Sequence, residues 1–236
     1  MECLYISSLN HNSDLITLNE SESRHTKALR LKVGDEILVT NGEGLSAVCE
    51  MIEIAKSGNK LQCLNFYENM NELKADITLA VGNLENTDRF EFLLEKSVEL
   101  GVVEIVPLIT KFSSNKSIKL ERMEAKIISA LKQSKRSRMT QISPPLPFEY
   151  LLNNLEKWDK VILADEHGQA ELTLGKSKNI LVLCGSEGGF SDMEIAQLKS
   201  SANVTALKLA ESRLRTETAA ISAITITVNT LLKESN

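Results

Sequence analysis

The stretch that says most about the fold is NILVLCGSEGGFSDMEI, which runs from residue 179 to residue 195. After one asparagine, the segment through Cys184 is continuously apolar, which is typical of a strand buried on both faces of a sheet. Three glycines follow, and Ser191 with Glu194 three residues later has the pattern of a helix capping box. A buried strand, a glycine-rich turn and a capped helix in succession predict an α/β sheet with mostly parallel strands.

The turn GSEGG, residues 185–189, stands where α/β proteins bind ligands. In such sheets the ligand lies beyond the carboxyl ends of the strands, and glycines let the backbone approach it closely. The turn lacks the Lys-Ser or Lys-Thr pair of a phosphate-binding loop, which argues against a nucleoside triphosphate. The alternative interpretation is a plain strand-to-helix turn.

The same alternation of strands and helices extends on both sides of this stretch. Apolar runs predict further strands at Ile77–Val81, Glu104–Ile109, Lys160–Ala164 and Val204–Leu209. Helical periodicity predicts helices at Arg89–Leu100, Glu121–Lys132, Asp192–Lys199 and about Glu217–Lys233. Together they predict one α/β domain over residues 74–236.

The first part of the chain has a different pattern, which predicts a separate domain over residues 1–70. Short strands are expected at Glu36–Thr40, Ala47–Ile54 and Lys60–Phe66, and an Asn-Gly pair after the first is a strong hairpin signal. A short helix is expected near Ser23–Leu31. Strands spaced in this way predict a small antiparallel β-barrel, and the polar residues 69–74 are the expected linker.

Composition narrows the class of protein. The 236 residues include 27 basic and 32 acidic ones, for a net charge of −5, and 42% are hydrophobic. These values are typical of globular proteins and exclude collagen-like and wholly disordered chains. No apolar run approaches a membrane span, and no secretory signal pattern is present. Four scattered cysteines and three scattered histidines predict reduced thiols, no metal site and a cytoplasmic location.

Positive charge is concentrated in one segment of this acidic chain. Residues 111–138 hold nine basic residues and two acidic ones, whereas residues 1–74 hold seven basic and eleven acidic ones. A local cationic field of this kind favours a polyanion such as nucleic acid. A solvated helix face is the alternative interpretation.

The segment RLRTET, residues 213–218, opens the last predicted helix. Thr216 is a candidate N-cap, and Glu217 complements the positive end of the helix dipole. The two arginines put positive charge near the positive end of that dipole, which is unfavourable. They therefore indicate an anionic partner, or carboxylates of another chain.

Several motifs, taken in order, resemble those of the bacterial 16S ribosomal RNA uridine N3-methyltransferases, members of the SPOUT superfamily of trefoil-knotted enzymes. The C-terminal ones are LCGSEGGFSDMEI and LKLAESRLRTETAAISAI. DRFEFLLEKSVELGVVEIVPL is similar to the central motif of the family, and SALKQSKRSR to its Glu-Gln-x-x-Arg segment. RHTKALRLKVGDEI with NGEG is similar to its N-terminal RNA-binding barrel, which is related to PUA domains.

The chain departs from the family pattern at a few positions. Ser186 stands where the family usually has proline, and Ala210 where it usually has glycine. Lys132 and Lys135 replace a usual glutamate and glycine, and Arg89 replaces a lysine. The first two changes lie in the segments that the resemblance assigns to the cofactor.

The resemblance implies a knotted α/β domain that binds S-adenosyl-L-methionine, preceded by a PUA-like β-barrel. The residues it assigns to the cofactor are Leu183, Gly185, Glu187, Gly188, Gly189, Leu207, Leu209, Ser212 and Leu214. Arg215 is expected to stabilise the negative charge of the reacting uridine. Glu217 is expected to accept a proton or to hold Arg215 in place, and we favour the second role because a helix N-terminus lowers carboxylate basicity.

The resemblance also implies an RNA partner, either 16S ribosomal RNA or the small ribosomal subunit. Basic and polar residues expected to contact RNA are Arg24, His25, Lys27, Arg30, Arg89, Lys111, Gln133, Arg136 and Arg138. A homodimer is expected through the last helix, although a buried core helix has the same pattern (Ala219, Ala220, Ile221, Ala223, Ile224 and Ile226). The alternatives are an RNA-binding protein whose methyltransferase site has decayed, and a knotted methyltransferase that acts on transfer RNA.

Overall fold

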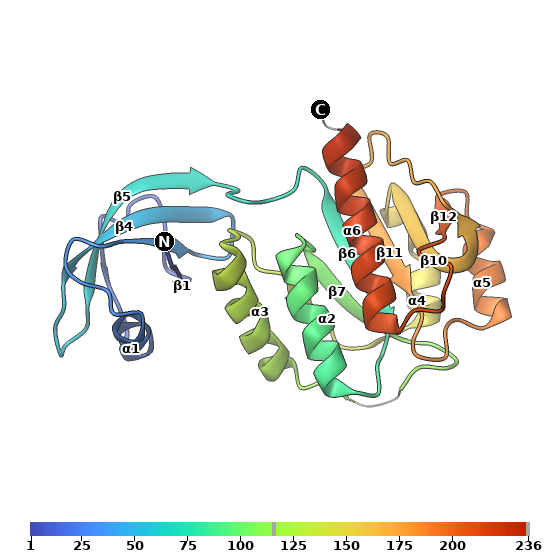
Figure 1. Cartoon of the computed structure of the whole chain (residues 1–236), viewed down its shortest axis with the longest axis horizontal. Helices are drawn as coiled ribbons and strands as arrows, with labels where there is room; N and C mark the ends of the chain where they lie inside the picture. The colour runs from blue at the N-terminus through green and yellow to red at the C-terminus, as the bar shows by residue number, and fades with distance from the viewer. Residues whose placement is uncertain (115–116, 235–236) are drawn as a thin grey trace. The chain divides into compact units, whose positions relative to one another are not determined.

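The computed structural model describes residues 1–114 and 117–234, and the chain divides into two units (Figure 1). The first unit consists of Met1–Glu72 together with Ile128–Met139. The second consists of Leu73–Ile127 and the chain from Thr140 onward. Helix α3, Leu120–Ser134, therefore has residues in both.

The first unit is built on a five-stranded sheet in the order β1-β3-β4-β5-β2. The elements are β1 Cys3–Tyr5, β2 Leu15–Thr17, α1 Glu20–Ala28, β3 Glu36–Thr40, β4 Leu45–Glu53 and β5 Lys60–Glu68. The expectation of an antiparallel barrel needs two corrections. Strand β1 pairs with β3 in parallel, and the sheet curls into a half-barrel in which β1 and β2 are the end strands.

The core of this unit is formed by the inward side chains of the curled sheet, among them Leu4, Ile37, Met51 and Leu61. Cys49 and Cys63 face each other across β4 and β5 with their sulfur atoms 3.4 Å apart. Both are free thiols, as are the other two cysteines, and all four are buried. The expectation that the cysteines are core residues is confirmed.

A buried group that we call the Glu72 cluster joins the two chain segments of the first unit. The Glu72 carboxylate accepts hydrogen bonds from the Arg136 guanidinium at 2.7 and 3.1 Å. It also accepts the backbone N–H groups of Ser137 and Arg138, each at 2.8 Å. Because a buried ion pair is stable only when its polar atoms are satisfied, this arrangement holds the segment after α3 in a defined conformation.

The second unit is an α/β sheet whose strands all run parallel, in the order β12-β10-β11-β6-β7-β8, with β9 also on β7. The strands are β6 Asp76–Gly82, β7 Glu104–Ile109, β8 Gln141–Ile142, β9 Leu146–Pro147, β10 Lys160–Gln169, β11 Asn179–Cys184 and β12 Val204–Leu207. The helical elements are α2 Thr87–Glu99, α4 Phe148–Leu152, the 3-10 turn η1 Leu155–Lys157, α5 Asp192–Lys199 and α6 Thr216–Glu234. The predicted parallel α/β domain is confirmed.

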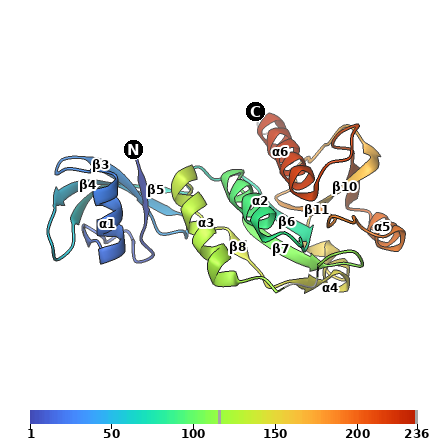
Figure 2. The same cartoon turned by 60° about the horizontal axis from the view of Figure 1, so that its bottom comes forward.

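Helices cover both faces of this sheet (Figure 2). On one face, Leu181 and Leu183 of β11 pack in a cluster with Phe148 and Leu151 of α4 and with Leu198 of α5. On the other face, α6 contacts β6, β10, β11 and α2. Successive strand residues point to opposite faces, so the fully apolar sequence of β11 follows from this two-sided burial.

Helix α1 begins and ends three residues earlier than predicted, and two strands of the second unit end at least two residues away from their predicted ends. Strand β10 continues to Gln169, because an irregularity after Ala164 lets it rejoin β12 at Leu207. Gly168 makes this possible, since a Cβ there would lie 2.6 Å from backbone atoms of Leu207. Strand β12 stops at Leu207 rather than at Leu209, and the chain then leaves the sheet. In the described residues, we find no helix with the length and hydropathy of a membrane span.

Candidate active site

The turn after β11 lies at the carboxyl end of the sheet, as its sequence predicts. Gly189 has a φ of +74°, and its N–H donates to the Ser186 carbonyl at 2.9 Å, which closes a tight turn. The Ser186 hydroxyl donates to the Phe112 carbonyl at 2.8 Å. A Cβ on Gly82, at the end of β6, would lie only 2.8 Å from Ser186 Cα. The turn therefore packs closely against the end of β6 and is hydrogen-bonded to the loop after β7.

A second loop, between β12 and α6, meets this turn. The Arg213 guanidinium donates to the Glu187 carbonyl at 3.4 Å. Lys208 N–H still donates to the Gln169 carbonyl at 2.9 Å. Among the described residues, the backbone N–H groups from Leu209 to Leu214 make no hydrogen bond. The two loops expected to cradle a ligand are thus adjacent, and one of them carries free backbone donors.

The residues assigned to a cofactor differ in what they expose. The side chains of Leu183 and Leu207 are fully buried in the sheet, so only their backbone atoms are available. Leu209 and Leu214 are half-buried, and Gly185 and Gly189 have no side chain. Glu187, Gly188 and Ser212 are exposed. Glu187 Oε1 also accepts the N–H of Glu85 at 3.2 Å.

The start of α6 brings charged residues to the same region. The helix begins at Thr216 rather than being capped by it, and the Arg215 carbonyl accepts the N–H of Ala219 at 2.8 Å. Arg215 is exposed and forms no ion pair within the described residues. Glu217 is buried at the foot of the helix.

Glu217 pairs with Arg89 of α2, with 3.8 Å between Glu217 Oε1 and Arg89 Nε. Its other oxygen, Oε2, is buried and has no hydrogen-bond partner among the described residues. The expectation that Glu217 holds Arg215 in place is therefore wrong. Arg215 lies ahead of the first turn with its side chain in solvent, whereas Arg89 comes from the helix packed against α6.

A polar cleft of about 720 Å³ lies beside these residues. Its lining comes from the N-terminal end of α2, the loop after β7 and the turn after β11 (Glu85, Asn86, Arg89, Phe112, Ser113, Ser114 and Glu187). Of these residues, the sequence pointed to Arg89 and Glu187 and missed the others. Phe112 has no local sequence signal that separates it from an ordinary loop aromatic.

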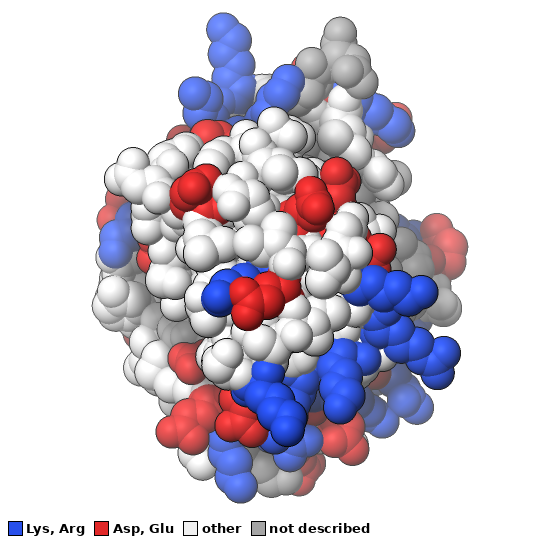
Figure 3. Space-filling model, turned by 90° about the vertical axis from the view of Figure 1, so that its left-hand side faces the viewer, with Lys and Arg blue, Asp and Glu red and all other residues white. Residues whose placement is uncertain are grey.

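The residues expected to contact RNA are divided between surface and interior. Arg24, Lys27 and Arg30 are exposed on α1 and directly after it, and His25 is half-buried. Figure 3 shows many Lys and Arg side chains toward the lower part of the view, with Asp and Glu side chains among them. Gln133 and Arg138 are also exposed, as is Lys111, whose ammonium lies 5.4 Å from the Phe112 ring centroid.

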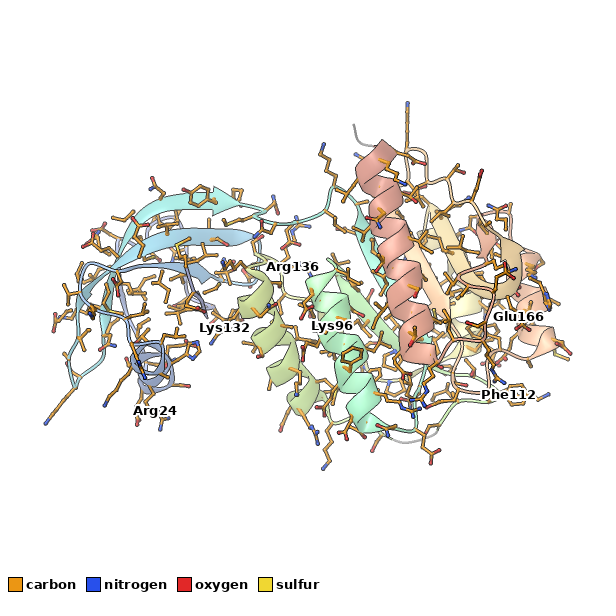
Figure 4. All side chains as sticks on the ribbon, viewed as in Figure 1. Arg24, Lys96, Phe112, Lys132, Arg136 and Glu166 are labelled. Atoms are coloured by element: carbon orange, nitrogen blue, oxygen red, sulfur yellow. The ribbon has the colours of Figure 1, made fainter. Side chains whose placement is uncertain are left out.

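Arg136 is an exception, since it is 2% exposed within the Glu72 cluster and cannot reach a phosphate without breaking that ion pair (Figure 4). Other cations of residues 111–138 are paired as well. Lys132 lies 3.5 Å from Glu22, and Arg122 and Lys126 pair with the buried Glu91. Lys116 is outside the described residues. The cationic field inferred from the sequence is therefore weaker than the count of residues implied.

The described part of the chain contains no group of three or more His, Cys, Asp or Glu side chains arranged to hold a metal ion.

Two family models match the chain. The RNA methyltransferase domain matches residues 71–228, and the RNA methyltransferase PUA domain matches residues 18–62. Proteins named ribosomal RNA small subunit methyltransferase E are similar over most of their length. The protein from Mesomycoplasma hyopneumoniae is 30% identical, covering 89% of this chain and 90% of that protein. The one from Rickettsia conorii is 29% identical, covering 94% and 92%.

Solved structures lead to the same family. The ribosomal RNA small subunit methyltransferase E of Neisseria gonorrhoeae, solved bound to S-adenosyl methionine, superposes with a TM-score of 0.86 at 27% identity, covering 97% of both chains. A probable rRNA methyltransferase from Porphyromonas gingivalis has a TM-score of 0.85 at 27% identity, covering 99% of both chains. The predicted fold class, a SPOUT methyltransferase domain preceded by a PUA-like domain, is confirmed. The chain therefore belongs to the RNA methyltransferase domain family, and it carries that family's PUA domain at its N-terminal side.

Proposed function

We propose that this protein transfers a methyl group from S-adenosyl-L-methionine to N3 of a uridine in 16S ribosomal RNA. The observation that carries the proposal is the contact between Arg213 and the Glu187 carbonyl, which joins the two ligand-binding loops beside Arg89 and Glu217. The names of the relatives support small-subunit ribosomal RNA as the substrate.

The two loops fit this cofactor in their chemistry. An adenine edge needs hydrogen-bond donors and acceptors, and the backbone from Leu209 to Leu214 has donors without partners in the described residues. Leu209 and Leu214 are half-buried and offer apolar contact to the adenine ring. Gly185, Gly188 and Gly189 leave room for close approach, while Glu187 and Ser212 add polar groups. The bound cofactor supplies an electrophilic methyl group.

Uridine N3 carries a proton at neutral pH, so the substrate must lose that proton before or during methylation. Arg215 is a cation without an ion-pair partner in the described residues, and it stabilises the charge that develops on the uracil oxygens. Because Glu217 does not hold Arg215, we assign it the other role expected of it, in which Oε2, a buried acceptor without a partner in the described residues, takes up the N3 proton. Glu217 Oε1 meanwhile holds Arg89 in place.

The exposed cations hold the RNA backbone. Arg24, Lys27 and Arg30 in the first unit, and Lys111 in the second, are exposed and can neutralise phosphates. For Arg24 this means exchanging its exposed 3.8 Å contact with Glu20 for the phosphate. Each neutralised phosphate releases condensed counterions, so RNA affinity falls as salt rises. A ribosomal substrate in turn places the protein in the cytoplasm.

We further propose that the protein is a homodimer. Ala220, Ala223 and Ile224 of α6 are buried within the chain and belong to its core. Ala219, Ile221 and Ile226 are only half-buried, so part of the apolar helix has no cover from the described residues. A second copy of the chain would cover this face, and sedimentation equilibrium tests it.

Two measurements test the proposed function. Calorimetry with S-adenosyl-L-methionine should show binding, and an absence of heat at high protein concentration would favour the RNA-binding alternative. Mass spectrometry of ribosomal RNA from a deletion strain should show loss of one N3-methyluridine from 16S RNA. Its return on complementation with the wild-type chain, but not with Arg215→Ala, assigns the activity. If the modification is lost from transfer RNA instead, the substrate is different.

A further inference from the structure

Phe112 is an aromatic side chain that the fold presents to solvent. It lies in the loop after β7, and 49% of it is exposed. Figure 4 labels it among the side chains at the edge of the second unit. Single exposed apolar side chains are common on protein surfaces, and Phe112 is distinguished by its place in the lining of the polar cleft.

Contacts within the protein explain the position of the Phe112 backbone and Cβ, but they do not explain why the ring is exposed. The Phe112 carbonyl accepts the Ser186 hydroxyl at 2.8 Å. A Cβ on Gly188 would lie 2.7 Å from Phe112 Cβ and 3.3 Å from its Cγ, so the glycine permits this close packing. These contacts place the ring beside the turn after β11 and involve none of its outer atoms.

The ring lines the polar cleft together with Arg89, Asn86 and Glu187. The carboxylates of Glu85 and Glu187 in the same lining repel a phosphate, whereas the π-face of a nucleobase tolerates them. The Lys111 ammonium lies 5.4 Å from the ring centroid and can take up one face of the ring. With 49% of the side chain exposed, the ring still offers surface on which a base can stack.

We propose that Phe112 is the stacking platform for an unpaired nucleobase of the substrate RNA. Stacking on an aromatic side chain is how proteins commonly hold splayed-out RNA bases. The cleft is continuous with the reacting groups through Arg89, which lines it and also pairs with Glu217. The proposal rests on the proposed function for the identity of the RNA, and it adds a substrate-positioning residue.

The first test replaces the ring alone. Phe112→Leu keeps the Cβ and Cγ atoms that pack on Gly188 and should leave the cofactor Kd unchanged. Because a stacked base contributes substantially to binding, kcat/KM for 16S RNA should fall about tenfold or more. The matched control is Phe92→Leu, since Phe92 is 50% exposed on α2 and has the Lys96 ammonium 5.8 Å from its centroid.

Phe92 lies outside the cleft lining, so its variant should keep wild-type kinetics. Equal kinetics for Phe112→Leu and the wild type would overturn the proposal. So would an equal loss in Phe92→Leu, or a weakened cofactor Kd in Phe112→Leu.

The second test needs no catalysis. Phe112→Trp is made in a Trp158→Phe background, so that position 112 carries the only tryptophan of the sequence. Titration with an unpaired RNA oligonucleotide should quench its fluorescence, and a duplex of the same sequence should not. If the wild-type chain methylates no 16S RNA, the proposed function fails, and this titration still decides the stacking. No quenching by unpaired RNA would overturn the stacking proposal whatever the activity.

Discussion

The Glu72 cluster and the start of α6 each combine a buried glutamate with arginines. The two regions differ in how many hydrogen bonds and ion pairs the glutamate makes. Both Glu72 oxygens accept several hydrogen bonds, and its partner Arg136 is 2% exposed. Glu217 lies 3.8 Å from Arg89, keeps one oxygen without a partner in the described residues, and has an exposed arginine two positions before it. Fully satisfied charges stabilise a fold, whereas incompletely satisfied ones at a cleft indicate a ligand.

The largest effect is expected in the Glu72 cluster. Arg136→Ala leaves the Glu72 carboxylate buried without its cation, so the free energy of unfolding should fall by about 3–5 kcal/mol. Urea unfolding followed by circular dichroism measures it. If the variant is as stable as the wild type, the ion pair is not structural, and Arg136 is again a candidate for RNA contact.

Arg138→Ala is the matched control for that experiment. The side chain is exposed, and its backbone N–H still donates to Glu72 after the substitution. Stability should change by less than about 1 kcal/mol, as for exposed charges in general. If Arg138 contacts a phosphate, the slope of RNA affinity against salt should flatten by about one.

The second effect belongs to the start of α6. Arg215→Ala should lower kcat about 100- to 1000-fold, which is typical of removing one group that stabilises a developing oxyanion. The exposed side chain has no ion-pair partner within the described residues, so unfolding and cofactor binding should be unchanged. Single-turnover methyl transfer checks the rate. An unaltered rate removes Arg215 from the mechanism, and a loss of stability would make it a structural residue like Arg136.

The third effect tests how closely the turn after β11 is held. Gly82→Ala puts a Cβ 2.8 Å from Ser186 Cα, so one backbone must move. Overpacking of this kind should destabilise the chain by about 1–3 kcal/mol. We also expect weaker cofactor binding by calorimetry. An unchanged free energy of unfolding together with an unchanged cofactor Kd would show that the turn accommodates the added methyl group without cost.

The smallest effect concerns a single hydrogen bond. Ser186→Ala removes the bond from its buried hydroxyl to the Phe112 carbonyl and should lower stability by about 1 kcal/mol. Ser200→Ala is the control, because its hydroxyl bonds the Gln197 carbonyl at an exposed site where water can replace it. Thermal unfolding of the two variants compares them, and an equal shift would show that the Ser186 bond has no special role.

Much of the fold follows from local sequence. Strands β3, β7 and β11 begin and end where their apolar runs do, and α5 begins after the capping box that the sequence shows. Burial on both faces leaves little choice of residue in such strands. The ends of β10 and β12 were less predictable, because the irregularity after Ala164 depends on the neighbouring strand.

The loops of the candidate site were predictable from the sequence, whereas the ion-pair partners of its charged side chains were not. Glycines after a buried strand, and arginines at a helix start, are visible in a short window of sequence. The pairing of Glu217 with Arg89, and of Arg136 with Glu72, joins residues far apart in the chain. The exposed ring of Phe112 has no local pattern at all.

The sequence by itself determined the class of sheet, the place of the glycine-rich turn and the family, because these depend on the order of apolar runs and short motifs. Only the tertiary structure decided which charges are free. Whether an arginine binds RNA or stabilises the fold depends on the carboxylate that lies beside it, and that neighbour is set by packing between distant segments. Arg136 and Arg215 look equally available in the sequence, and they differ because Arg136 is paired with a buried carboxylate whereas Arg215 forms no ion pair within the described residues.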